Sequence, residues 1–263
     1  MPPTEGASYR IVDHVERFVA PHSITFNCSA DKLYCGHRDA FEVFDLHRPG
    51  EGDRVHTISS RKSKDGMKGI ISSMAFSPDY SGLFAAGSFS SALWLFAEGQ
   101  GSDPVCQISG SSTSVSQVKF NPMQPQILYA SFRMETHILA WDTRNATIPV
   151  AKYVRSGNVT NQRLWFDIDP SGRWLASGSD TGTVGFYDVS SSAETGQPMY
   201  TFAAHGDVVG SVAFHPSHPT VLTVSGSRHF EEEAYISEDD GSHPQHLRAK
   251  PVATEAMMKI WNI

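Results

Sequence analysis

The chain has 263 residues, of which 40% are apolar and 19% are charged, a composition that supports a hydrophobic core and excludes disorder along the whole length. Its formal net charge is −7, but six acids lie in residues 231–240, so the rest is nearly neutral. This charge excludes a protein that binds nucleic acid through bulk positive charge alone. No apolar run is long enough for a transmembrane helix, and the first residues, MPPTEGASYR, lack the apolar core of a secretory signal.

A sequence repeat runs along the chain. Its anchor is an apolar residue followed two positions later by proline, and successive anchors are 44, 48 and 46 residues apart. The anchors are Phe76–Pro78, Phe120–Pro122, Ile168–Pro170 and Phe214–Pro216, with a weaker first copy at Phe26.

Two short apolar runs follow each anchor and predict further strands. The first runs are rich in small residues: LYCG (33–36), LFAAGS (83–88), LYAS (128–131), LASGS (175–179) and VLTVSGS (221–227). The second runs end near an aromatic residue: EVFDL (42–46), LWLF (93–96), LAWD (139–142), GFYD (185–188) and KIWN (259–262). Short strands separated by turn residues are typical of four-stranded antiparallel meanders, which bury both faces when packed around an axis. The sequence predicts an all-β propeller of five units over residues 21–263, after a lead-in at 1–20.

Individual positions resemble the WD40 repeat. One unit closes in Trp141–Asp142, the pair that gives this repeat its name. His205 matches the usual Gly-His position, with Ala204 in place of glycine, and Asp180 matches the usual turn aspartate. We interpret His205 as a structural hydrogen-bonding histidine. The unit of His205 has no aspartate before KIWN, so its tetrad of hydrogen-bonded side chains is expected to be incomplete.

Longer segments are similar to the WD-repeat telomerase Cajal-body protein family. These segments are GIISSMAFSP (69–78), LFAAGSFSSALWLF (83–96) and VTNQRLWFDIDPSGRWLASGSDTGTVGFYD (159–188), of which TNQR is not a general WD40 feature. The resemblance implies a propeller that binds box H/ACA small Cajal-body RNAs and telomerase RNA. It also implies core proteins of those particles as partners, and a nuclear location in the Cajal body or nucleoplasm.

The number of units departs from that family, whose members carry more propeller before the matching region. We expect the five units to be part of a seven-bladed ring in a shortened chain. The alternative is a five-bladed ring in which residues 9–20 supply the fourth strand of the last unit, because that unit ends at WNI.

Basic residues gather in the loops that a propeller places on one face. The two loop sets hold eight basic residues and one acid: Arg38, Arg133, Asp180 and Arg228 in one set, and Arg61, Lys62, Lys64, Lys68 and Arg163 in the other. Phe89, Phe132 and Phe230 lie nearby in the sequence. Guanidinium groups can pair phosphates or guanine edges, and aromatic rings can stack bases, so this face is a candidate for single-stranded RNA. The alternative is that these side chains are simply solvated.

The resemblance selects five residues from this region. Arg133, Arg163 and Arg228 match positions where the family carries arginine, and Asn161 and Gln162 belong to TNQR. It implies that Arg163 and Gln162 are polar readers at the face, with Arg133 and Arg228 as phosphate or partner contacts. Asn161 and Gln162 have an equally open structural interpretation as side chains that hydrogen-bond the loop backbone. Arg144, on the opposite face, is expected to pair with Asp142 or with a neighbouring blade.

Residues 229–256 interrupt the last unit and are predicted to be a disordered insertion, because they are acidic at the start and lack an apolar period. The three cysteines, Cys28, Cys35 and Cys106, form no CxxC pair, which fits a reducing compartment.

Catalytic and metal-binding patterns are missing from the sequence. We find no nucleophile elbow, Walker loop or GxGxxG, and Asp167 and Asp169, which flank the FDIDP turn, are not expected to act as an acid–base pair on one substrate. His215 and His218 lack the company of other ligands, so no metal site and no cofactor are predicted.

The predicted function is a non-catalytic WD40 scaffold that binds small nuclear RNA and its particle proteins, supporting particle localisation, assembly and telomere maintenance. The alternative is a general WD40 protein-interaction scaffold, for example in mRNA splicing, with no RNA contact. A propeller hydrolase or lyase is the third class. Neither a membrane nor a small-molecule substrate is expected as a partner.

Overall fold

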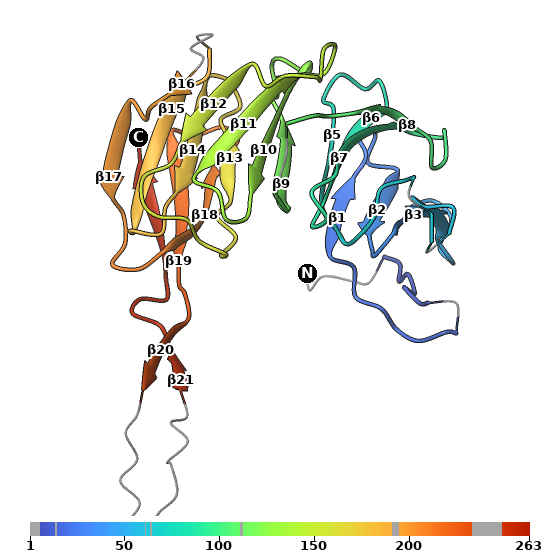
Figure 1. Cartoon of the computed structure of the whole chain (residues 1–263), viewed down its shortest axis with the longest axis horizontal. Helices are drawn as coiled ribbons and strands as arrows, with labels where there is room; N and C mark the ends of the chain where they lie inside the picture. The colour runs from blue at the N-terminus through green and yellow to red at the C-terminus, as the bar shows by residue number, and fades with distance from the viewer. Residues whose placement is uncertain are drawn as a thin grey trace, which may run out of the picture.

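The computed structural model describes residues 6–13, 15–60, 62–63, 65–110, 113–190, 195–232 and 249–263. All the regular elements in these ranges are β-strands, so the all-β prediction is confirmed. The described residues include no helix of the length and apolarity needed to cross a membrane. Figure 1 shows the sheets following one another around an arc, and we refer to them as blades 1 to 5 in chain order.

The blades are antiparallel meanders in which strands adjacent in sequence are also adjacent in the sheet. Blade 1 comprises β1 (Ser23–Phe26), β2 (Lys32–Gly36), β3 (Ala40–Asp45) and β4 (Asp53–His56). Blade 2 comprises β5 (Ile71–Phe76), β6 (Leu83–Ser88), β7 (Leu93–Ala97) and β8 (Pro104–Gln107). Blade 3 comprises β9 (Val115–Phe120), β10 (Ile127–Phe132), β11 (His137–Asp142) and β12 (Ala151–Val154), with the short β16 (Thr195–Gly196) parallel to β12.

Blade 4 comprises β13 (Phe166–Ile168), β14 (Trp174–Gly178), β15 (Thr183–Asp188) and β17 (Tyr200–Ala203). Blade 5 comprises β18 (Val209–Phe214), β19 (Thr220–Ser225) and β22 (Met257–Asn262). A separate two-stranded ribbon, β20 (His229–Glu232) and β21 (Ala249–Val252), leaves blade 5 between β19 and β22. The five repeat units predicted from the sequence therefore correspond to five propeller blades.

The repeat anchors explain where the first strand of each blade ends. The apolar residue of every anchor, including the weak first copy, is the last residue of that strand: Phe26, Phe76, Phe120, Ile168 and Phe214. In four blades a proline follows two positions later, and proline cannot donate a ladder hydrogen bond. The anchor therefore ends the strand and begins the turn to the next.

Each interface between adjacent blades has its own hydrophobic core. Tyr34 and Phe41 of blade 1 pack against Phe84 and Phe96 of blade 2, and the Phe41 and Phe84 ring centroids lie 5.6 Å apart. The corresponding clusters join blades 2 and 3 around Trp141, blades 3 and 4 around Tyr187, and blades 4 and 5 around Val209. Because apolar burial drives folding, each blade is stabilised mainly by its neighbours.

Glycine at the end of a second strand lets the next blade approach closely. A Cβ on Gly87 would lie 2.3 Å from the Cγ1 atom of Val115, the first residue of β9. A Cβ on Gly178 would lie 2.3 Å from the backbone oxygen of Val209, the first residue of β18. Real Cβ atoms do not approach other atoms this closely, so these positions require glycine for space near the axis.

Polar side chains join the first strands of neighbouring blades. The Gln117 side chain of β9 donates to the Phe166 carbonyl at 2.9 Å and accepts from the Phe166 amide at 2.9 Å. Asp167 pairs with Lys119 of blade 3 and accepts from the Phe214 amide of blade 5 at 2.8 Å. Asp167 is thus a link across three blades. Asp169 has different partners, and its carboxylate caps its own turn by accepting from the Trp174 amide.

Among the described residues, no strand pairing joins blade 1 to blade 5. Among the described strands, β22 pairs with β19 alone. The lead-in segment lies against blade 1, where the Tyr9 hydroxyl donates to the Leu46 carbonyl at 3.1 Å and Arg54 donates to the Val12 carbonyl. Residues 9–20 therefore do not supply the fourth strand of blade 5, and the five-bladed closed ring considered from the sequence does not form here.

Candidate nucleic-acid interface

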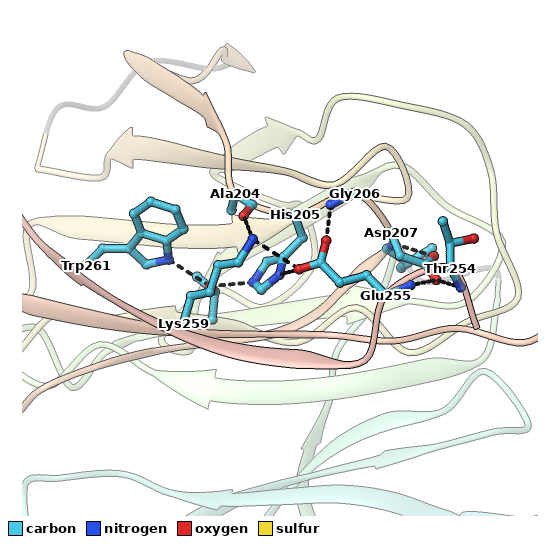
Figure 2. Close-up of polar contacts among 10 residues, drawn as sticks. Ala204, His205, Gly206, Asp207, Thr254, Glu255, Lys259 and Trp261 are labelled. Atoms are coloured by element: carbon cyan, nitrogen blue, oxygen red, sulfur yellow. Dashed lines mark hydrogen bonds and ion pairs between the residues drawn. The ribbon is translucent and has the colours of Figure 1, made fainter.

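Blade 5 contains a complete hydrogen-bonded tetrad of side chains (Figure 2). The Trp261 indole donates to the Thr223 hydroxyl at 2.8 Å, and that hydroxyl lies 2.7 Å from Nε2 of His205. Nδ1 of His205 lies 2.7 Å from Oε1 of Glu255. Because an ionised carboxylate can only accept, Nδ1 of His205 carries the proton that is donated to Glu255, and in the neutral imidazole Nε2 accepts from the Thr223 hydroxyl.

The prediction that this tetrad is incomplete is therefore wrong. Glu255 takes the position at which an aspartate was sought, two residues before β22 begins. The additional methylene of glutamate lets the carboxylate reach His205 from there. A search for any carboxylate just before the third strand would have found it.

Glu255 predicts a pH dependence of stability. The Gly206 amide, His205 and Lys259 donate to its carboxylate and lower its pKa to about 2, from a usual value of 4.5. The folded pKa is depressed, so this stabilisation is present above about pH 4.5 and is lost as the pH falls toward 2. Glu255→Gln should reduce the free energy of unfolding near neutral pH, and the difference from wild type should shrink on acidification, as measured by urea unfolding. Glu51→Gln removes a carboxylate from an exposed position and serves as the control. A Glu255→Gln difference that stays constant with pH would contradict this role.

Asp207 holds the base of the β20–β21 ribbon against blade 5. It accepts from the Ser227 hydroxyl at 2.7 Å and from the Thr254 amide at 3.1 Å, and it pairs with His229 at 2.9 Å. Burial alone would raise the pKa of Asp207, but these hydrogen bonds hold it below its usual value. The ends of the segment predicted as a disordered insertion are thus paired and anchored, and its middle, 233–248, lies outside the described residues.

The loop face brings together two of the predicted arginines around one ring. The guanidinium carbon of Arg133 lies 5.2 Å from the centroid of the Phe89 ring, and that of Arg163 lies 5.0 Å from it. Phe89 follows β6, Arg133 follows β10, and Arg163 lies between β12 and β13. Loops of blades 2 and 3 and the connection into blade 4 therefore meet at this cluster, which we call the Phe89 cluster.

The TNQR segment contacts this cluster through its backbone. Arg133 Nε donates to the Asn161 carbonyl at 3.3 Å, and the Met134 amide donates to the Thr160 carbonyl at 3.0 Å. The backbone amide of Gln162 donates to the Thr160 hydroxyl. Asn161 and Gln162 are both exposed. Their side chains are thus accessible from solvent, while their backbone forms the turn.

The remaining predicted residues lie elsewhere. Arg228 is exposed at the base of the ribbon, between Ser227 and His229, and shows no contact with the Phe89 cluster among the described residues. Asp180 accepts the Asn158 amide at 3.0 Å, which fixes the loop that leads to TNQR. Trp141 is fully buried and donates to the Ser109 carbonyl at 2.9 Å. Arg144 pairs with Asp142 at 2.6 Å, as expected.

Of the three aromatic residues considered for base stacking, one is buried and one has a side chain outside the described part of the chain. Phe132 is buried against Trp141 and cannot stack a base. The Phe230 side chain lies outside the described part, as do Arg61 and Lys64. Phe89 is therefore the one of the three aromatics that the structure places at the cluster.

A buried arginine was missed by the sequence analysis. Arg155 is 5% exposed and donates from Nη1 to the Leu164 carbonyl at 3.1 Å. Burial lowers its pKa to about 10. Ala151, Tyr153 and Arg155 alternate inward along and just beyond β12, and this alternation is the signal that could have placed Arg155 inside. Through the Leu164 carbonyl, Arg155 fixes the C-terminal end of the loop that carries Arg163.

Neither histidine considered for a metal belongs to a ligand cluster in the described part of the chain. The Nδ1 atom of His215 accepts the amides of Ser217 and His218 at 3.1 and 3.0 Å. These bonds make His215 part of a turn.

Comparison with known proteins agrees with this architecture. The family described as "WD domain, G-beta repeat" matches residues 154–188 and 196–229, which cover blade 4 and the first part of blade 5. Telomerase Cajal body protein 1 of Homo sapiens is 33% identical over 259 residues, covering 97% of this chain and 46% of the human protein. This chain belongs to the WD40-repeat telomerase Cajal-body protein family.

Other members of the telomerase Cajal-body protein family show the same pattern. Telomerase Cajal body protein 1 of Mesocricetus auratus is 35% identical over 230 residues, covering 86% of this chain and 41% of the hamster protein. The homolog of Drosophila melanogaster is 27% identical over 233 residues, covering 86% of this chain and 40% of the fly protein. The chain spans about half the length of these curated relatives.

Proposed function

We propose that this chain is a non-catalytic WD40 scaffold that binds small nuclear RNA on its loop face and assembles with the core proteins of the RNA particle. The RNAs would be of the H/ACA class, either small Cajal-body RNA or telomerase RNA. The names of the relatives refer to telomerase and to the Cajal body, a nuclear compartment, and they support a nuclear location and a role in particle localisation and telomere maintenance.

The observation that carries the proposal is the Phe89 cluster. Two guanidinium groups lie over one ring, and neither forms an ion pair with a carboxylate of the described residues. Unpaired arginines beside exposed polar groups such as Asn161 and Gln162 suit a single-stranded RNA, since arginine forms charge-assisted hydrogen bonds with phosphate. A single cluster of this kind also agrees with a chain that lacks bulk positive charge.

A protein partner is favoured by a different surface. Met258, Ile260 and Ile263 are 63%, 68% and 57% exposed at the unpaired edge of blade 5. Exposed apolar side chains that cluster on one edge are typical of protein contact. The second candidate is therefore a protein-interaction scaffold, for example in splicing assembly, without RNA contact.

Crosslinking and immunoprecipitation of the endogenous protein, with sequencing of the bound RNA, separates the two. Enrichment of H/ACA-type RNA that is lost in Arg163→Ala supports RNA binding at the loop face. RNA at background level, with particle proteins still recovered, would leave the protein scaffold as the function. For direct contact, binding to the recovered RNA should weaken with salt by a log–log slope of about −0.7 per phosphate contacted.

A further inference from the structure

The Phe89 ring lies beneath arginine side chains on the face that is proposed to bind RNA. Both guanidinium groups of the cluster lie over this ring, so their central carbons cannot be further apart than the sum of the two distances, 5.2 and 5.0 Å. We infer that Phe89 is a positioning residue, which holds Arg133 and Arg163 together to bind the phosphodiester backbone and does not itself stack a base. This inference rests on the proposed function and specifies the chemistry of its site.

The backbone of Phe89 is held from two sides. Its amide donates to the Ile70 carbonyl at 3.0 Å, and its carbonyl accepts from the Ser114 hydroxyl at 2.6 Å. The Ser114 carbonyl in turn accepts from the Arg133 amide at 2.9 Å. Hydrogen bonds of Ser114 therefore connect the backbone of Phe89 to that of Arg133, and the ring is a fixed support for the guanidinium group of Arg133.

Arg163 is fixed from the opposite side of the cluster. Arg155 holds the Leu164 carbonyl at 3.1 Å, immediately after Arg163. Arg133 holds the Asn161 carbonyl, two residues before it, at 3.3 Å. Gln162 and Arg163 are the two residues between these anchored carbonyls, so the Arg163 side chain reaches Phe89 from a backbone that is fixed on both sides. A site organised before binding loses less conformational entropy when the ligand arrives.

The acidic side chains of this face have partners other than the two arginines of the cluster. Glu135 pairs with His137 at 3.0 Å, Asp180 accepts the Asn158 amide at 3.0 Å, and Asp39 accepts the Gly69 amide at 2.6 Å. None of these carboxylates is paired with Arg133 or Arg163. Two positive charges placed around one ring, without a carboxylate partner among the described residues, favour an anion, and the phosphodiester is the anion that every RNA supplies.

Phosphate binding keeps the contacts of the cluster, whereas base stacking on Phe89 competes with them. A base that stacks on the ring would compete with the two guanidinium groups for its surface. The phosphates of an RNA backbone can pair with the guanidinium groups while both contacts with the ring remain.

The test compares two synthetic RNAs of the segment crosslinked to the wild-type chain. One carries all its bases, and the other carries abasic sugars at the crosslinked positions. Both are labelled with fluorescein and titrated by anisotropy against the wild-type chain, Phe89→Leu, Phe89→Tyr and Arg144→Ala. Phe89→Leu removes the ring but keeps an apolar side chain, Phe89→Tyr keeps the ring, and Arg144 lies at the opposite ends of the strands. Thermal unfolding of each variant verifies its fold.

Phe89→Leu should weaken binding of both RNAs about three- to fivefold, as the loss of the cation–π support predicts, while Phe89→Tyr and Arg144→Ala bind like wild type. In the Arg133→Ala/Arg163→Ala background, Phe89→Leu should have no further effect, because Phe89 acts through the arginines.

Two outcomes overturn the inference while RNA binding stands. In the first, Phe89→Leu weakens the intact RNA but not the abasic one, which would mean that the ring stacks a base. In the second, the loss persists in the double-arginine background, which would mean that Phe89 acts independently. A wild-type chain that binds neither RNA overturns the proposed function and this inference together.

Discussion

Gly178→Ala should destabilise the protein by about 3 kcal/mol, because the added methyl group has no space between blades 4 and 5. Its Cβ would lie 2.3 Å from the Val209 carbonyl oxygen and 2.7 Å from the Val209 Cβ. The nearest atom belongs to the backbone of β18, so no side-chain rotation relieves the contact. The blades must separate, and the interface around Val209, Val212 and Val221 loses packing.

Urea unfolding followed by circular dichroism measures this change, and Gly210→Ala is the matched control. Gly210 lies in β18, the strand whose first residue, Val209, Gly178 contacts, and a Cβ on Gly210 meets nothing within 4 Å. Because alanine also restricts the unfolded chain, Gly210→Ala should leave stability unchanged or raise it by a few tenths of a kcal/mol. Equal midpoints for the two variants would show that blade 5 does not pack against blade 4 as described.

The double variant Arg133→Ala/Arg163→Ala should weaken binding of the H/ACA-type RNA by about 100-fold. One good arginine contact contributes about 1–3 kcal/mol, and a tenfold change in affinity corresponds to about 1.4 kcal/mol. The two side chains share the Phe89 ring, so we expect their effects to be non-additive. Filter binding at several salt concentrations should also show a shallower salt dependence, since fewer phosphates are neutralised.

Arg144→Ala serves as the control for charge. It removes one arginine that pairs with Asp142 and is 74% exposed in its side chain, at the other end of the strands from Arg133. Its RNA affinity should equal that of wild type. If Arg144→Ala weakened binding as much as either arginine of the cluster, the RNA contact would depend on overall charge and not on this site.

The blades could be predicted from the sequence because their determinants are local. An apolar residue and a proline two positions later end the first strand in four blades, and small residues follow in the second strand. Even the weak copy at Phe26 marks the end of β1. Trp141 and His205 also lie at positions that the repeat pattern assigns to hydrogen-bonding side chains.

The contacts between loops could not be predicted in the same way. Glu255 reaches His205 from 50 positions further along the chain, and it lies within the segment 229–256 that was predicted to be a disordered insertion. Arg133 and Arg163 were selected by resemblance, but only the packing of three blades shows that both lie over Phe89. Arg155 has the charge of a surface residue, and its burial follows from the alternation beyond β12.

The arc of five blades has a consequence for how the molecule fluctuates. Each blade has its own core with each neighbour, so blades 2, 3 and 4 are held from two sides within this chain. Amide protons of a repeat unit that is packed on both sides exchange slowly with solvent, because the unit opens only when both interfaces are lost. The Phe89 cluster lies on the loops of these blades. An RNA bound there would rest on a slowly exchanging part of the chain.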